Sequence, residues 1–369
     1  IAGRDSDKLK ALKNKLGEQA QALPTLIGNA SNESDLNALC AKTKVIVSTV
    51  GPYALYGSSL VKVCAETGTD YCDLTGEVQW IARMIEAHEA TARQSGARIV
   101  HCCGFDSIPS DLGVLFLQES AKTQYGEPCN QVRMRVRNLK GEFSGGTVAS
   151  MINVTREVAA DRSLAKKLAN PYLISPTRLA ARQPNVSFAE FDPVAKSWLA
   201  PFVMAGINTR VVHRSNALQD YSYGKDFKYD EAMMTGNGFK GRLTAMGLAG
   251  GMAGFLIGAA LPPTRWALEK FVVPKPGEGP SESSQQRGSY DLRFYGTTSK
   301  GKSLVAKVTG DMDPGYGSTG KMLGEAVVCL AKDMANKPGG FWTPASLMGG
   351  KLMSRLQQHA GLTFELLEN

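Results

Sequence analysis

Residues 1–120 alternate between apolar patterns of helical spacing and short extended apolar runs. The run 45–50 (Val-Ile-Val-Ser-Thr-Val) is rich in β-branched residues, as in strands buried on both faces of a parallel sheet. In 77–95, by contrast, apolar residues recur at helical spacing. The same criteria predict strands over 71–74 and 97–103 and helices over 6–16, 32–41, 58–66 and 109–118. This alternation predicts an α/β fold with a doubly wound parallel sheet of right-handed βαβ units.

The pattern changes after Cys129. Apolar and charged residues alternate over 131–139, which predicts a strand with one solvated face. Residues 147–168 and 317–336 have helical spacing, and 170–197 is polar and interrupted by prolines, as in loops. Four more segments predict strands: 209–217, 221–229, 290–295 and 302–309. We therefore expect three parts: a first domain over 1–125, an α+β domain with a mixed or antiparallel sheet over 126–315, and C-terminal helices over 316–369 that pack back on the first domain.

Residues 243–261 contain no charged residue and end at Pro262-Pro263. The segment is long enough to span a bilayer and has glycines at small-xxx-small spacing, but few large apolar side chains. Three alternatives are open: a buried or surface-lying pair of helices, a lipid-surface element, or a true span. Residues 274–286 follow as a linker-like loop.

Composition narrows the possible partners. The net charge of +8 would suit a polyanion, but lysines and arginines are scattered over helical and alternating patterns that indicate solvated faces. We expect no nucleic-acid partner. Seven cysteines without a C-x-x-C pattern and four dispersed histidines indicate a reduced, intracellular protein with no metal site.

The start of the chain, Ile1-Ala2-Gly3-Arg4, has the pattern of a strand end that leads into a helix. In doubly wound sheets that bind dinucleotides, a basic residue after the second strand meets a 2′-phosphate, and the glycine-rich phosphate loop lies about 20 residues upstream. Either Arg4 is an ordinary surface residue, or it is part of a dinucleotide site whose first βα unit is missing.

A G-x-G-x-x-G pattern does occur at 315–320, before a predicted helix. Residues 310–314 separate it from the preceding strand, and the short remainder of the chain offers no βαβ unit, so we do not expect a dinucleotide loop. The helix N-terminus either begins there with Ser318 or Thr319 as its cap, or holds an anionic ligand.

The motif Val50-Gly51-Pro52-Tyr53 follows a predicted strand at the edge where ligands of open parallel sheets bind. Gly51 would let the backbone approach a flat ring, and Tyr53 would offer a ring face and a hydroxyl. A plain strand-to-helix turn is an equal alternative.

Gly104-Phe105-Asp106-Ser107 occupies the corresponding place after a later strand. Asp106 would face the cleft, whereas Ser107 could simply cap the next helix. One strand away, Asp73 and Glu77 could act in acid–base chemistry or serve as helix caps.

Six stretches together resemble the saccharopine dehydrogenase-like oxidoreductases, in the branch of the mycobacterial trans-acting enoyl reductases and their eukaryotic lipid-droplet relatives. They are Ala2 to Leu9, Val50 to Tyr53, Gly68 to Glu77, Gly104 to Asp111, Lys275 to Pro280 and Gly310 to Tyr316. The resemblance implies a Rossmann domain interrupted by a mixed-sheet domain, dependence on a nicotinamide cofactor, and hydride transfer.

The resemblance also implies site residues. Arg4 and Lys8 would meet the 2′-phosphate of NADP, and Val50, Gly51, Pro52 and Tyr53 would lie against its nicotinamide half. Gly104 and Phe105 would lie near the reacting centre, Asp106, Ser107 and Tyr316 would meet substrate, and Asp106 or Tyr53 would donate a proton or orient the substrate. Family members begin with a strand and a glycine-rich loop that this sequence lacks, so we expect an incomplete, N-terminally truncated Rossmann domain that binds NADP poorly.

We expect an NADP-dependent oxidoreductase that transfers hydride to a C=C or C=O bond of a lipid-like or acyl substrate, in lipid or glycolipid metabolism. Substrate carboxylates of a lysine-pathway enzyme would require an arginine cluster, for which only Arg210 and Arg214 are candidates. The alternative is a non-catalytic protein of a lipid droplet or membrane surface. The lipid association of the branch favours 243–261 as a membrane-surface element of a cytoplasmic protein.

Overall fold

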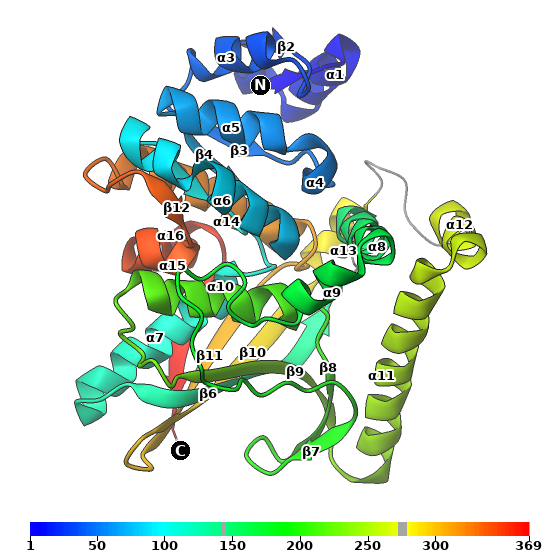
Figure 1. The fold of residues 1–369 in the computed structure, drawn as a ribbon, viewed down its shortest axis with the longest axis vertical. Coiled ribbons are helices and arrows are strands. Elements are labelled where there is room, and N and C mark those ends of the chain that lie inside the picture. Colours follow the sequence, from blue (N-terminus) through cyan, green and yellow to red (C-terminus); the bar gives the residue numbers. More distant parts are fainter. Residues whose placement is uncertain (142–144, 272–278, 369) are drawn as a thin grey trace.

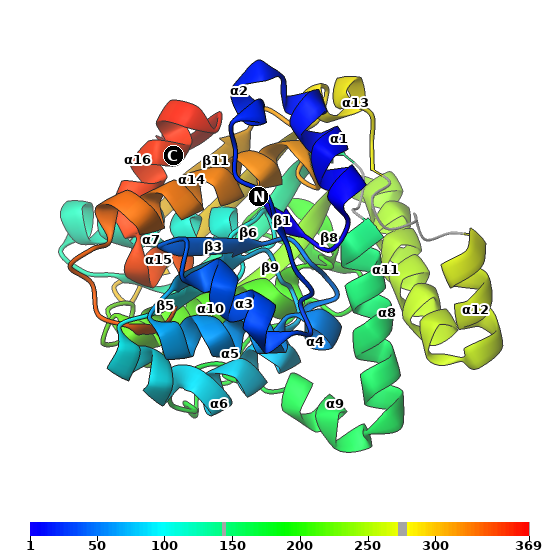
Figure 2. The ribbon, with the colours of Figure 1, turned by 90° about the horizontal axis from the view of Figure 1, so that it is seen from above.

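A four-stranded parallel sheet organises the N-terminal part of the molecule. The computed structural model describes residues 1–141, 145–271 and 279–368. The sheet has the order β12-β5-β4-β3, formed by β3 (Val45–Ser48), β4 (Asp70–Asp73), β5 (Arg98–Val100) and β12 (Gly340–Trp342). Helices α5 (Ser58–Thr67) and α6 (Val78–Ser95) cover one face, and α14 (Gly317–Asp333) packs on β3 and β4 from the other (Figures 1 and 2). The predicted doubly wound α/β sheet is confirmed.

A separate two-stranded parallel sheet lies beyond α5, with β1 (Ala2–Gly3) beside β2 (Leu26–Ile27) (Figure 1). Three short helices surround it: α1 (Ser6–Leu16), α2 (Glu18–Gln21) and α3 (Glu33–Cys40). Within the described residues, no strand joins this pair to β3.

The prediction that 45–50 is a strand buried on both faces is wrong, because one face of β3 leaves Val47 largely uncovered and the strand is shorter. The strand ends at Ser48, and the Val47 and Val50 side chains are 43% and 50% exposed.

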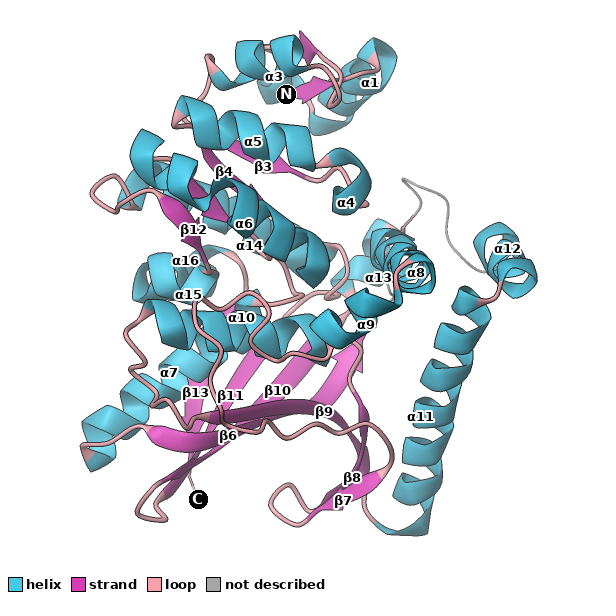
Figure 3. Ribbon diagram, in the orientation of Figure 1, coloured by secondary structure: helices cyan, strands magenta, loops and turns pink. Residues whose placement is uncertain are grey.

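The larger sheet has seven strands in the order β13-β11-β10-β6-β9-β8-β7 (Figure 3). Its members are β6 (Cys129–Lys140), β7 (Glu190–Asp192), β8 (Ser197–Pro201), β9 (Lys228–Gly236), β10 (Ser289–Thr298), β11 (Ser303–Gly310) and β13 (Leu362–Leu367). Only β6 and β9 pair in parallel; the other neighbours are antiparallel. This confirms the predicted mixed sheet.

Helices fill the space between and beside the two sheets. Both α7 (Ile108–Tyr125) and α10 (Ala205–Leu218) pack on the large sheet and on each other. The remaining helices are α4 (Tyr53–Tyr56), α8 (Gly145–Ala160), α9 (Arg162–Leu168), α11 (Gly238–Ala260), α12 (Pro262–Phe271), α13 (Glu282–Gln286), α15 (Pro344–Leu347) and α16 (Gly349–His359). The C-terminal part supplies α14 and β12 to the first sheet and β13 to the second, so it contributes strands as well as the predicted helices.

Several predicted elements are wrong. Residues 209–217 form helix α10, whose buried polar residues, such as Arg214 and Asn216, hide its helical apolar spacing. Of 221–229, only the last two residues belong to β9; the earlier residues form turns in which Tyr221 has a φ of 57°. Residues 243–261 lie in one long helix rather than a pair. The predicted linker falls partly outside the described residues, and its end forms α13.

Close packing of α7 on the large sheet generates the first testable prediction. A Cβ atom at Gly113 of α7 would lie 2.3 Å from Cζ of the buried Phe294 of β10. Gly113→Ala should therefore lower the free energy of unfolding by about 1–3 kcal/mol through overpacking, measured by urea denaturation.

Gly324→Ala is the matched control, because Gly324 is exposed on α14 with no heavy atom within 4 Å of its ideal Cβ position. This change should raise the unfolding free energy by up to about 1 kcal/mol through helix propensity. Equal stability of Gly113→Ala and the parent would contradict the packing described.

Candidate functional site

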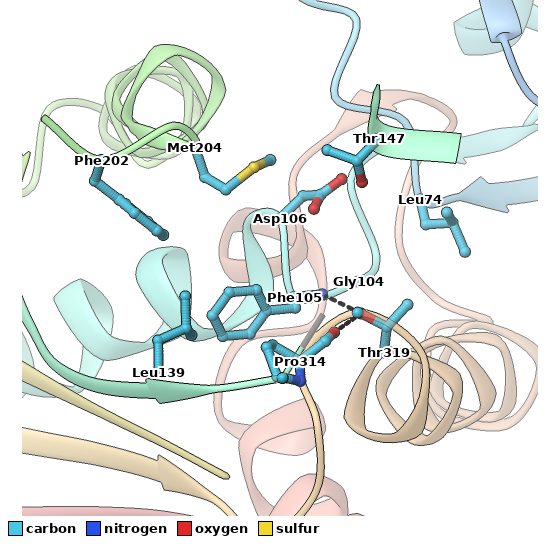
Figure 4. Close-up of a pocket in the computed structure, with 12 residues that line it drawn as sticks. Leu74, Gly104, Phe105, Asp106, Leu139, Thr147, Phe202, Met204, Pro314 and Thr319 are labelled. Carbon is cyan, nitrogen blue, oxygen red and sulfur yellow. Dashed lines mark hydrogen bonds between the residues drawn. The ribbon is translucent and has the colours of Figure 1, made fainter. Parts of the chain in front are cut away.

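A small cavity lies where the carboxyl ends of β4 and β5 approach the large sheet. It encloses about 60 Å³. Its apolar wall contains side chains from five separate stretches of chain: Leu74, Phe105, Leu139, Phe202, Met204 and Pro314. Thr147 of α8 and Thr319 of α14 also line it (Figure 4). The site is thus assembled from residues distant in the sequence.

Among the described residues that line the cavity, Asp106 is the one acidic residue. It lies in the turn between β5 and α7, and Figure 4 shows its carboxylate directed into the space beside Met204 and Thr147. The carboxylate accepts no hydrogen bond from the described residues. Burial raises the pKa of Asp106 to about 7, and the negative charge of Asp73 adds to the shift. Asp106 can therefore hold a proton at neutral pH.

Asp73, at the end of β4, differs from Asp106 because its carboxylate accepts several hydrogen bonds. It is fully buried, and its Oδ1 accepts hydrogen bonds from the backbone N–H groups of Thr75 (3.1 Å) and Cys102 (3.2 Å). Its Oδ2 accepts one from the Tyr71 hydroxyl (3.0 Å) and lies 2.7 Å from Nδ1 of His101. The contacts with Cys102 and His101 hold the end of β4 to the chain after β5, and those with Tyr71 and Thr75 fix β4 and its turn. These contacts indicate a structural carboxylate rather than half of an acid–base pair.

Glu77 caps the short helix α4. Its carboxylate accepts hydrogen bonds from the backbone N–H groups of Tyr53 (2.6 Å) and Ala54 (3.1 Å), and from the Ser150 hydroxyl (3.0 Å) of α8. Of the two alternatives for this residue, the structure supports helix capping, although of α4 rather than of its own helix.

The turn after β3 holds the residues that we predicted to lie against the nicotinamide. Val50 and Gly51 are exposed and Pro52 is half-buried. Tyr53 is buried, and its hydroxyl donates to the backbone carbonyl of Ser48 (2.9 Å), while burial raises its pKa far above the usual range. The Tyr53 hydroxyl therefore orients the turn and does not line the cavity.

Gly104 and Phe105 do line the cavity, and α14 holds them in place. The Phe105 N–H donates to the Thr319 hydroxyl (3.0 Å), which itself donates to the carbonyl of Pro314 (2.7 Å). A Cβ atom at Gly104 would lie 3.2 Å from Cγ2 of Thr319 and 3.3 Å from Cβ of Leu74. Glycine thus permits the close approach of α14.

Ser107 is fully buried beneath the cavity floor, and its hydroxyl donates to Oδ1 of Asn208 (3.0 Å). Asn208 in turn donates to Ser110 and to Glu231 of β9 (2.9 Å). Sequence reasoning missed this buried polar network, because Asn208 stands just before the segment predicted to be a strand and the helix that carries it, α10, was not predicted. Ser107 therefore serves the interior of the protein rather than the cavity surface.

Backbone N–H groups of the 315–320 loop already have hydrogen-bond acceptors within the chain. The buried carboxylate of Asp313 accepts hydrogen bonds from the N–H groups of Gly315 (2.9 Å), Tyr316 (3.3 Å) and Gly317 (2.8 Å). Neither Ser318 nor Thr319 caps α14, so that prediction is wrong. Since Asp313 occupies these donors, the loop offers no cradle for a phosphate or another anion.

Arg4 and Lys8 lie at the carboxyl end of β1, and both are exposed. Neither forms an ion pair within the described part of the chain, and the intervening Asp5 turns its carboxylate to cap α1. Two unpaired cations at this edge fit the 2′-phosphate of NADP. Among the described residues, no group of three or more His, Cys, Asp or Glu could hold a metal ion.

The chain is similar in sequence to several known proteins. Residues 1–100 match the family described as the saccharopine dehydrogenase NADP-binding domain. A relative from Mycobacterium tuberculosis, assigned by its name to the trans-acting enoyl reductases, is 41% identical over 96% of this chain and 88% of its own length. The trans-acting enoyl reductase of Mycobacterium ulcerans is 37% identical over 97% of this chain and 88% of its own length.

The fold has a counterpart among solved structures. Saccharopine dehydrogenase (L-Glu forming) from Saccharomyces cerevisiae superposes with a TM-score of 0.54 over 100% of this chain and 94% of that one, at 13% identity. The fold and the NADP-binding domain define an oxidoreductase of the saccharopine dehydrogenase-like class. Within that class, the chain belongs to the family of the trans-acting enoyl reductases.

The contact between Thr319 and Phe105 generates the second prediction. Thr319→Val keeps the shape of the side chain but leaves the buried Phe105 N–H without an acceptor, so the unfolding free energy should fall by about 1–3 kcal/mol in urea denaturation. Thr319→Ser retains the acceptor and should lose less. If the valine variant proves as stable as the serine variant, the hydrogen bond does not hold α14 to the site.

Proposed function

We propose that this chain is an NADPH-dependent reductase that reduces a C=C bond conjugated to the carbonyl group of a lipid-like acyl substrate. The observation that carries the proposal is Asp106, a carboxyl group with a pKa of about 7 directed into a largely apolar cavity. The names of the relatives, trans-acting enoyl reductases, support the choice of a C=C bond.

Reduction of such a bond adds a hydride to one carbon and a proton to the other. When bound, the nicotinamide of NADPH supplies the hydride. The protonated Asp106 carboxyl donates the proton to the carbon next to the carbonyl group, and the carboxylate regains a proton from solvent. The apolar wall around Asp106 excludes water and accommodates the atoms next to the double bond, while a long acyl chain would extend outside the small cavity.

The remaining roles concern binding and positioning. Arg4 and Lys8 would hold the 2′-phosphate, and the exposed Val50, Gly51 and Pro52 would lie beside the nicotinamide half. Gly104 and Phe105 would form the floor under the reacting bond. We assign Tyr53, Ser107 and Tyr316 to the positioning of these segments, because the Tyr53 and Ser107 hydroxyls and the Tyr316 N–H are engaged within the chain.

The test is NADPH consumption with trans-2-enoyl thioesters of increasing chain length, with the saturated thioesters as blanks. Asp106→Asn should lower kcat by about 10²–10⁴-fold, because the amide cannot donate an acidic proton. Tyr53→Phe should retain most of the activity, and so should the control Asp226→Asn, a change of the same kind at an exposed position. Consumption of no enoyl thioester, or full activity of Asp106→Asn, would refute the proposal.

The pKa of Asp106 predicts the pH dependence of the reaction. At saturating substrate, kcat should be constant at acidic pH and fall about tenfold per pH unit above pH 7, because only the protonated carboxyl donates.

The raised pKa also means that the folded state binds this proton more tightly than the unfolded state, so the contribution of Asp106 to stability decreases as pH rises towards 7. Asp106→Asn should therefore be at least as stable as the parent at about pH 8, which separates lost chemistry from lost folding.

Arg4 generates a prediction about cofactor choice. Arg4→Ala should weaken NADPH binding by about ten- to a hundredfold, because a charged hydrogen bond to the 2′-phosphate is lost, with little change for NADH. Fluorescence titration with both cofactors measures the effect. Equal losses for the two cofactors would leave Arg4 without this role.

A further inference from the structure

Helix α11 leaves most of its apolar surface uncovered. It is long and apolar enough to cross a membrane, but only 17% of its most apolar window is buried. Core helices of soluble proteins have the same length and composition but are mostly buried, unlike this one. We call α11 and α12 together, residues 238–271, the apolar arm; in Figures 1 and 2 it forms the outer edge of the molecule. Its large exposed apolar side chains are Phe239, Leu243, Met246, Leu248, Leu256, Ile257, Leu261 and Trp266.

Small residues attach the arm to the body. Gly241, Ala245 and Ala249 recur every fourth residue and are buried where α11 packs on β8 and α8. A Cβ atom at Gly241 would lie 2.3 Å from the carbonyl oxygen of Gly236, so the contact is close. Because this strip of contacts is narrow, the described residues leave the other sides of α11 uncovered.

The exposed apolar residues are not confined to one stripe. Leu248 follows Phe239 by nine residues, which places it about half a turn around the helix axis. A protein partner, including a second copy of this chain, would cover one side of the helix, whereas lipid chains surround it on every free side. The apolar surface also continues onto β7 and its flanks, which α11 contacts, through the exposed Phe188, Phe191 and Val194.

The charges of the arm match an anionic lipid surface. Residues 238–271 contain one acidic residue, Glu269, and four basic ones: Lys270 at the far end and the three cations Lys240, Arg242 and Arg265. These cations lie near the two ends of α11, and the apolar residues lie between them. Near the far end, the Lys270 ammonium lies 4.7 Å from the ring centre of the exposed Trp266, and such pairs are typical of the membrane interface.

The path of the chain excludes α11 as a helix that spans a membrane. Helix α11 begins directly after β9, and the chain beyond α12 returns to β10; both strands pair with β6 in the same sheet. Since both ends of the arm return to one folded sheet, they lie on one side of any membrane.

We propose that the apolar arm docks the protein onto the surface of membranes that carry anionic lipids, with α11 inserted among the lipid chains of one leaflet and its terminal cations at the headgroups. The proposal does not depend on the reductase activity. Helix α8, whose Thr147 lines the Asp106 cavity, packs against α11, so docking would bring that cavity close to the lipid.

The experiment is flotation of the full chain with vesicles of phosphatidylcholine alone and of phosphatidylcholine with phosphatidylglycerol. The protein should float with the anionic vesicles. Leu243→Glu and Ile257→Glu should each weaken vesicle binding about tenfold or more, because each replaces an exposed, inserting apolar side chain with a charge. Leu366→Glu, an exposed apolar residue of β13 outside the arm, is the matched control and should float like the parent.

Two further measurements make the proposal falsifiable. Lys240→Glu combined with Arg265→Glu should reduce binding to anionic vesicles and remove its salt dependence.

Sedimentation velocity tests the alternative that a second copy of this chain covers the arm. A dimer that Ile257→Glu converts to monomers, with no vesicle binding by the parent, would assign the arm to a second copy and overturn the proposal. Flotation unaffected by the arm variants, or resistance of the bound protein to alkaline extraction as in a true span, would also overturn it.

Discussion

The buried carboxylate of Asp73 is the contact on which the site depends. It accepts hydrogen bonds from the ends of both β4 and β5 and from Tyr71, and it lies against His101. A charge in the interior is stable only when such partners surround it, so these contacts fix the two strand ends relative to each other. The same negative charge adds to the raised pKa of Asp106. One structural group thereby both positions the turn that carries Asp106 and helps to keep its proton at neutral pH.

The C-terminal part of the chain completes the N-terminal sheet. Strand β12 pairs with β5, α14 covers β3 and β4, and Thr319 accepts a hydrogen bond from Phe105 at the cavity. Arg98 of β5 adds a second link, because its guanidinium pairs with Asp70 of β4 and also donates to the carbonyl of Met334 beyond α14. The N-terminal sheet is therefore stabilised by contacts between residues more than 200 positions apart in sequence. Asp106 consequently lies in a turn that parts of the chain far apart in sequence hold in place.

Local pattern predicted β3, β4 and β5 of the first sheet but not β12, the β6, β10 and β11 strands of the second, and most of the long helices. It failed for 209–217, because Arg214, Ser215 and Asn216 are polar residues that the fold buries with hydrogen-bond partners from other elements. A sequence window has no access to those partners and therefore reads such residues as exposed. The same limit applies to the site: Asp73, Glu77 and Asp106 all follow or flank strand β4 or β5, and nothing local separates the structural carboxylates from the one that faces the cavity.

The sequence by itself determined the alternation of strands and helices, the strand-end positions of the site motifs, the family, and the existence of a long uncharged apolar segment. These features are encoded in short-range periodicity and in the identity of contiguous residues. Tertiary structure alone decided which polar groups are free. Four groups near the site have hydrogen-bond partners within the chain: Tyr53 with Ser48, Glu77 with Ser150, Ser107 with Asn208, and the 315–320 loop with Asp313. Asp106 has none among the described residues. It also decided that α11 lies outside the core, because burial depends on what packs against a helix and not on its own composition.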